Sequence, residues 1–138
     1  ECMGKKFLLS HGDEWCTKDT EYQKFRAMTR DPDWQLAALA LPIEKRIELA
    51  KSARAKSIEA KKTASSVMMD VVDVDVYKAA KAAGADIVVH GHPPRPASHE
   101  LAEIERWVIP DWDLDAGAGK DHWGYIRTVN GQRLQIIM

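Results

Sequence analysis

The chain has 138 residues, of which 45 % are hydrophobic and 30 % are charged, and this composition is typical of a globular domain with its own apolar core. Its formal net charge is −1, so no overall positive field attracts it to nucleic acid, and we expect no nucleic-acid partner. No run of about 18 apolar residues is present and the first residues lack an apolar signal stretch, so we expect a protein that neither spans a membrane nor is exported, with Cys2 and Cys16 as free thiols.

The first predicted element is a buried strand at residues 7–10, where an apolar run follows two lysines and ends in His11-Gly12-Asp13. A histidine at a strand end is either a loop residue satisfied by its neighbours or a metal ligand. Asp13 likewise has a functional and a structural interpretation, because an aspartate in a turn commonly caps its own backbone.

Two helices are predicted next. Thr20-x-x-Gln23 resembles a capping box and predicts a helix over about 20–30. Asp31 and Pro32 then suit the cap and the first turn of a second helix. The segment from Trp34 to Leu41 is apolar on nearly every side, so it must be buried against protein, an acyl chain or a membrane interface. Packing in the core of the protein is the simplest of these interpretations.

Pro42 opens the longest helical pattern, which continues past residue 60. Its surface carries seven basic residues and three acidic ones, a net charge of +4 on a chain that is −1 overall. A basic amphipathic helix is typical of a membrane-surface or anion-binding segment, although an ordinary solvated helix face has the same composition. The basic residues are Lys45, Arg46, Lys51, Arg54, Lys56, Lys61 and Lys62, and the acidic ones are Glu44, Glu48 and Glu59.

A second buried strand is predicted at residues 87–89, after a helix that Asp73 or Asp75 caps and Gly84 ends. Its uninterrupted apolar run is typical of a parallel strand, and it leads directly into His90-Gly91-His92. Because ligands bind at the carboxyl ends of strands in open α/β sheets, this loop is a candidate metal site together with His11.

The remaining elements are a strand at about residues 106–109, stopped by Pro110, and a hairpin. The hairpin joins residues 125–129 to residues 133–137 through Asn130-Gly131, a strong turn signal. The whole pattern predicts an α/β fold that ends in a β-hairpin.

Nine short motifs stand in a fixed order along nearly the whole chain: His11-Gly12-Asp13, Cys16-Thr17, Tyr22-Gln23, Phe25-Arg26, Ala40-Leu41-Pro42, Met69-Asp70-Val71, His90-Gly91-His92, Arg95-Pro96 and Pro110-Asp111-Trp112. In this order they resemble the UDP-2,3-diacylglucosamine diphosphatases, which belong to the calcineurin-like metallophosphoesterases. The resemblance implies hydrolysis of the pyrophosphate of UDP-2,3-diacylglucosamine to UMP and 2,3-diacylglucosamine 1-phosphate in lipid A biosynthesis. It also implies two Mn²⁺ ions on an α/β sandwich, and a cytoplasmic enzyme that is peripheral on the inner membrane.

The resemblance implies that residues 1–138 are the C-terminal part of such a domain, with a helical lid inserted at about 20–66. His11 and His92 match metal histidines of the family. Pro94 stands where the family's Gly-His-x-His has its second histidine, and Pro94 cannot bind an ion. The family's earlier blocks, Asp-x-His, Gly-Asp-x-x-Asp and Gly-Asn, have no counterpart, so we expect at most a partial Mn²⁺ site and no catalytic residue in this chain.

Substrate positions carry over in part. Four residues stand at positions that the family uses around its substrate: Asp19, Ser57, Lys61 and His92. Lys61 stands where asparagine is usual, and Ala64 stands where lysine is usual at a further position. We therefore expect an enzyme by family whose isolated chain is inactive, with the lipid substrate, a membrane surface and a missing N-terminal half as partners. The alternative is a non-catalytic module, derived from that enzyme, that binds lipid or a membrane surface.

Overall fold

The computed structural model describes residues 2–63, 70–92, 96–112 and 123–138, with the backbone alone at 61–63. The chain divides into two compact units. The first consists of Glu1–Cys16 with Asp70–Met138, and the second is Thr17–Met69. The lid expected at about residues 20–66 falls within the second unit, and its role as a lid stays a prediction. Pro94 and Ala64 lie outside the described residues.

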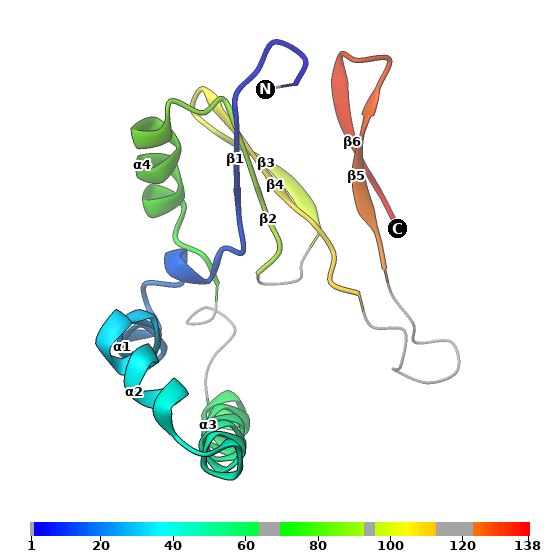
Figure 1. Cartoon of the computed structure of the whole chain (residues 1–138). Helices are drawn as coiled ribbons and strands as arrows, with labels where there is room; N and C mark the ends of the chain where they lie inside the picture. Colours follow the sequence, from blue (N-terminus) through cyan, green and yellow to red (C-terminus); the bar gives the residue numbers. More distant parts are fainter. Residues whose placement is uncertain (1, 64–69, 93–95, 113–122) are drawn as a thin grey trace. The chain divides into compact units, whose positions relative to one another are not determined.

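The first unit contains a four-stranded sheet built from β1 (Phe7–Ser10), β2 (Ile87–His90), β3 (Ala97–Leu101) and β4 (Ile104–Val108). The order of the strands in the sheet is β1-β2-β4-β3. Strands β1, β2 and β4 run parallel, and β3 runs antiparallel to β4 (Figure 1). Ser10 pairs with His90, so β1 and β2 end level. The predicted α/β class is confirmed, and the loops after these two strands leave the sheet at the same edge.

One helix, α4 (Asp73–Ala83), covers one face of this sheet (Figure 1). Val76 and Ala80 of the helix are fully buried, together with Val88 of β2, and they form one apolar cluster with Ile104 and Trp15. Removing an aliphatic side chain of this size from water contributes about 1.5–3 kcal/mol. The uninterrupted apolar run in β2 is therefore explained by burial of the strand in the centre of the sheet.

Helix ends partly follow the predicted signals. Gly84 ends α4 in the left-handed conformation, with φ of 61°, as predicted. The predicted cap at Asp73 or Asp75 is wrong, because Val72 is the N-cap residue and Asp73 instead pairs with Arg106 of β4. A tertiary ion pair here replaces a local cap.

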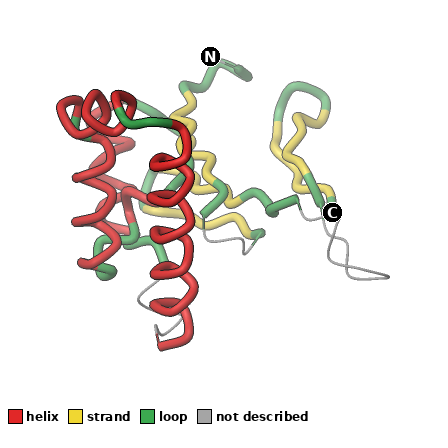
Figure 2. The backbone as a smooth tube through the Cα atoms, turned by 60° about the horizontal axis from the view of Figure 1, so that its bottom comes forward, coloured by secondary structure: helices red, strands yellow, loops and turns green. Residues whose placement is uncertain are grey.

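The second unit contains three helices among its described residues: α1 (Thr20–Arg30), α2 (Pro32–Ala40) and α3 (Ile43–Thr63) (Figure 2). The cap of α1 is Asp19 rather than Thr20, because the Asp19 carboxylate accepts a hydrogen bond from Tyr22 N at 3.0 Å. Asp31 caps α2 as predicted, by accepting from Trp34 N at 2.9 Å.

Packing of the apolar segment at 34–41 in the core of the protein, the simplest of the three interpretations, is wrong, and its burial against an acyl chain or a membrane interface stays a prediction. Leu36 is 68 % exposed and Leu39 is 64 % exposed, and no residue of α2 is buried. Ile43 and Ile47 at the start of α3 are also exposed. The described part of the second unit thus exposes apolar side chains on α2 and at the start of α3. No helix in the described ranges combines the length and the apolar character that crossing a membrane requires.

The C-terminal hairpin is confirmed. Strands β5 (Tyr125–Val129) and β6 (Arg133–Ile137) pair antiparallel, and Asn130 and Gly131 both have positive φ, as the turn requires. Strand β3 was not predicted, since the sequence Ala97-Ser98-His99-Glu100-Leu101 is largely polar. It forms because β4 offers it an antiparallel partner along all five residues.

Replacing Gly84 tests whether its positive φ governs the end of α4. A Cβ there would meet only Lys6 Nζ, at an ordinary 3.7 Å, so the cost of G84A is conformational. We expect G84A to lower the free energy of unfolding by about 1 kcal/mol in urea denaturation. G84N should cost less, because asparagine tolerates the left-handed region better. Equal effects of the two substitutions would contradict this explanation.

Candidate functional site

The loops after β1 and β2 are joined by their main chains. The carbonyl oxygen of His11 accepts hydrogen bonds from Gly91 N at 3.2 Å and from His92 N at 2.9 Å. The rings of His11 and His92 consequently lie together, with centroids 5.3 Å apart and planes 24° from parallel. The predicted proximity of these two histidines is confirmed, and their role as metal ligands stays a prediction.

Gly12 makes this close approach possible. Its φ is +98°, a conformation that residues with a side chain rarely adopt. A Cβ at this position would lie 2.8 Å from His90 Nδ1 and 2.8 Å from His92 O. Any side chain would therefore push apart the two loops that carry the histidines.

His90 lies beneath the pair, 1 % exposed. Its Nδ1 is 2.9 Å from the carbonyl oxygen of His92, and its ring meets Trp15 edge-on at a centroid distance of 5.6 Å. Because a carbonyl only accepts, Nδ1 carries the proton and donates it to His92 O. Nε2 is buried and has no partner among the described residues.

Burial, reinforced by the nearby positive charge of Arg106, lowers the pKa of His90 from 6.5 to about 4. His90 is thus neutral near pH 7, and it fixes the main chain of His92 from below. An unpaired buried nitrogen costs about 1–3 kcal/mol. His90 supplies a hydrogen-bond donor at Nδ1. An apolar side chain of similar size would not supply one.

Asp13 is the second polar residue behind the pair. Its side chain is 3 % exposed, and Oδ1 lies 3.0 Å from Nδ1 of His11, whose own side chain is 68 % exposed. The sequence leaves Asp13 open as a turn residue or a metal ligand. The signal that was missed is the spacing, because Gly12 turns the chain so that the residue two positions after His11 reaches its ring.

The donor set fits one side of a metal centre. Neutral imidazole is a common ligand for transition metals, and His11 and His92 bring two such rings together at the end of the sheet. No group of three or more histidine, cysteine, aspartate or glutamate side chains able to hold an ion occurs among the residues whose placement is described. The described residues thus bring two imidazoles to one place, which is fewer ligands than a complete ion site needs.

The predicted substrate residues other than His92 belong to the second unit. Asp19 caps α1, and Ser57 is exposed on α3. Lys61 lies on the same helix, and its side chain is outside the described part of the structure. Their role in substrate binding stays a prediction.

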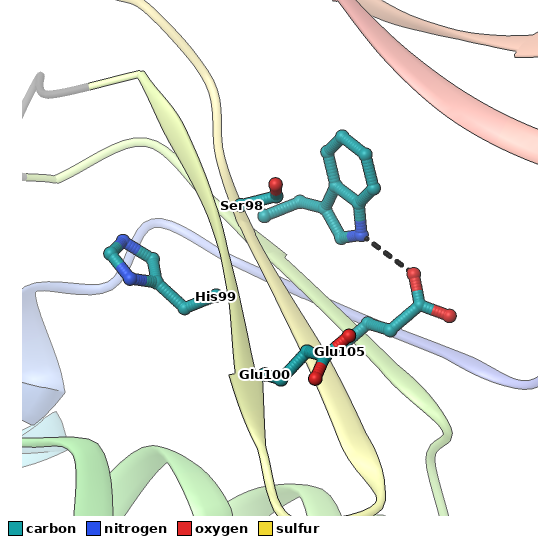
Figure 3. Close-up of a pocket in the computed structure, with 5 residues that line it drawn as sticks. Ser98, His99, Glu100 and Glu105 are labelled. Carbon is teal, nitrogen blue, oxygen red and sulfur yellow. Dashed lines mark hydrogen bonds between the residues drawn. The ribbon is translucent and has the colours of Figure 1, made fainter.

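A pocket of about 350 Å³ lies on strands β3 and β4 (Figure 3), and neither His11 nor His92 lines it. It is lined by Ser98, His99, Glu100, Glu105 and Trp107. Trp107 Nε1 donates to Glu105 at 3.1 Å, and the hydrogen bond from Lys5 lowers the pKa of the Glu105 carboxyl. Two carboxylates make this pocket unsuited to a phosphorylated ligand.

Comparison with known proteins gives several curated relatives. The chain is 47 % identical over 114 residues to "UDP-2,3-diacylglucosamine hydrolase" of Bordetella parapertussis, covering 80 % of this chain and 44 % of that protein. The protein of the same name from Chromohalobacter salexigens is 48 % identical, covering 76 % and 44 % respectively. The one from Cellvibrio japonicus is 41 % identical, covering 86 % and 53 %.

The chain thus spans about half the length of the curated relatives that it matches. No family model matches the chain.

The lowered pKa of His90 predicts a specific acid sensitivity. Between about pH 6.5 and pH 4 the unfolded chain binds a proton that the native chain does not, so the free energy of unfolding falls as pH falls through this window. The loss should reach about 3 kcal/mol at pH 4. Urea denaturation of the metal-free chain in EDTA measures it.

H90L removes the titrating group and should flatten that part of the pH profile, although it lowers stability near pH 7 by removing the bond to His92 O. H99A changes an exposed histidine and should leave the profile as it is. An H90L profile parallel to that of the unmodified chain would contradict the assignment to His90.

Proposed function

Because the chain belongs to the family of the UDP-2,3-diacylglucosamine hydrolases, we propose that it contributes to hydrolysis of the pyrophosphate of UDP-2,3-diacylglucosamine to UMP and 2,3-diacylglucosamine 1-phosphate. The observation that carries the proposal is the pairing of His11 with His92 at the level ends of β1 and β2. Both lie in the motifs that match the family's metal histidines. The reaction would then take place at this edge of the sheet.

In this proposal His11 and His92 hold Mn²⁺, and His90 and Gly12 keep their main chains in register. A bound divalent ion supplies Lewis-acid polarisation of a phosphoryl oxygen and a lowered pKa for the attacking water. His92 would also meet the substrate. The family resemblance alone makes Asp19, Ser57 and Lys61 of the helical unit proposed substrate residues.

We propose further that the 138-residue polypeptide is inactive by itself. Two imidazoles cannot complete a two-ion centre, which needs bridging and terminal carboxylates as well. The face of the sheet opposite α4 supports the same view, because Leu9 of β1 is 72 % exposed there. Sheets with parallel strands are ordinarily covered on both faces.

Activity tests this proposal directly. Fusing the chain to the part of the Bordetella parapertussis protein that it does not match should give Mn²⁺-dependent release of UMP, and P94H should raise the rate because it restores a histidine donor. In this fusion H11A and H92A should each lower kcat/KM by at least about 100-fold. H99A, on exposed β3, is the matched control and should retain activity.

Two results would contradict the proposal. One is release of UMP by the purified 138-residue chain alone, which would show that the remaining ligands are already present. The other is a fusion that stays inactive with and without P94H.

A second candidate function is a non-catalytic module that binds lipid or a membrane surface. Leu36 and Leu39 are exposed on α2 and Ile43 is exposed on α3, a helix whose sequence carries seven basic residues. Apolar side chains flanked by cations fit the interface of an anionic bilayer, where each basic residue contributes about 1 kcal/mol. In either function the helical unit would place the protein on a membrane as a peripheral component.

Vesicle flotation tests this surface. The chain should float with phosphatidylcholine vesicles that contain phosphatidylglycerol, and K51E/R54E/K56E should abolish this binding. K5E, in the first unit, is a control with a single charge reversal outside the helices. Absence of flotation at low salt would rule out the second function.

A further inference from the structure

The strongest unexplained contact in the site is that between His11 and Asp13. The imidazole of His11 is largely exposed, so a histidine in this position would ordinarily rotate and exchange between tautomers. Instead its Nδ1 is 3.0 Å from Oδ1 of Asp13. An ionised carboxylate only accepts, so this contact places the proton on Nδ1 and leaves the lone pair on Nε2.

Asp13 itself is fixed by the backbone around it. It begins a 3-10 helix, Asp13–Trp15, which Trp15 N closes by donating to Gly12 O at 3.1 Å. The chain that returns at Val72 bonds to the same turn, because Val72 N donates to Trp15 O at 2.9 Å. The carboxylate that meets His11 is therefore held on a rigid, buried turn.

The main chain of His11 is fixed as well, by the hydrogen bond from His92 N to His11 O at 2.9 Å. Both ends of the contact between the His11 ring and Asp13 are therefore held by main-chain hydrogen bonds. Ligating histidines commonly donate their second N–H to a carboxylate, which orients the ring and raises the basicity of the ligating nitrogen.

We propose that Asp13 is a positioning residue, which orients the His11 ring and keeps its proton on Nδ1 so that Nε2 serves as the donor to a divalent metal ion. This inference rests on the proposed function for the identity of the ion. A purely structural Asp13, which only stabilises the turn, would leave the tautomer of His11 unaffected.

The tautomer can be measured in the metal-free 138-residue chain. Long-range ¹H–¹⁵N correlation of the histidine rings at about pH 8.5, where ordinary histidines are neutral, distinguishes a proton on Nδ1 from one on Nε2. We expect His11 to carry its proton on Nδ1. In D13A it should shift towards the Nε2–H form that free imidazole side chains favour in water, whereas His99 should not change in either protein.

Addition of Mn²⁺ alone gives a second measurement. The ion should broaden the ring signals of His11 and His92 before those of His99. In D13A the Mn²⁺ concentration needed should rise about 10–100-fold. D13E, which keeps a carboxylate, should need less Mn²⁺ than D13A.

Two results would overturn the inference. The first is a proton on Nε2 of His11 in the unmodified chain, a measurement that needs no folded variant. The second is a Mn²⁺ response at His11 that is absent, or that does not differ between a folded D13A and the unmodified chain. A fusion that releases no UMP would count against the proposed function and leave the tautomer result standing.

Discussion

The structure of the candidate site depends on one main-chain hydrogen bond, in which His92 N donates to His11 O at 2.9 Å. It ties the loop after β1 to the loop after β2, two segments about 80 residues apart in the chain. The bond forms because the two strands are parallel neighbours that end level, with Ser10 opposite His90. Gly12 permits the approach, since any Cβ would collide with His90 and with the main chain of His92.

Two buried polar side chains then support the pair of His11 and His92. His90 donates from below to the carbonyl of His92, and Asp13 accepts from the ring of His11. Both are costly to bury, because polar groups lose their water. Such groups are well placed to hold functional side chains in one geometry, since they are themselves held by packing against Trp15 and by the turn at Gly12. The site is thus organised by the sheet and stabilised from its interior.

Much of the fold could be predicted because its signals are local. The apolar run of β2, the glycine that ends α4 and the Asn130-Gly131 turn each specify their own structure. Strand β3 could not be predicted, because it depends on pairing with β4 rather than on its own residues. The buried state of His90 depends on a sheet register, which a sequence pattern does not contain. The reach of Asp13 to His11 depends on the φ angle of Gly12, for which the spacing in His11-Gly12-Asp13 is a sequence signal. The exposure of Leu36 and Leu39 likewise depends on which segments lie near α2.

The proposed function depends most on whether the paired imidazoles of His11 and His92 form one side of a metal centre. The most direct measurement is X-ray absorption at the manganese edge, on the 138-residue chain with one equivalent of Mn²⁺. We expect the scattering pattern of two imidazole ligands in the unmodified chain. The pattern should show one imidazole in H11A and in H92A, and two in H99A. A spectrum with oxygen neighbours alone, the same in all four proteins, would contradict it.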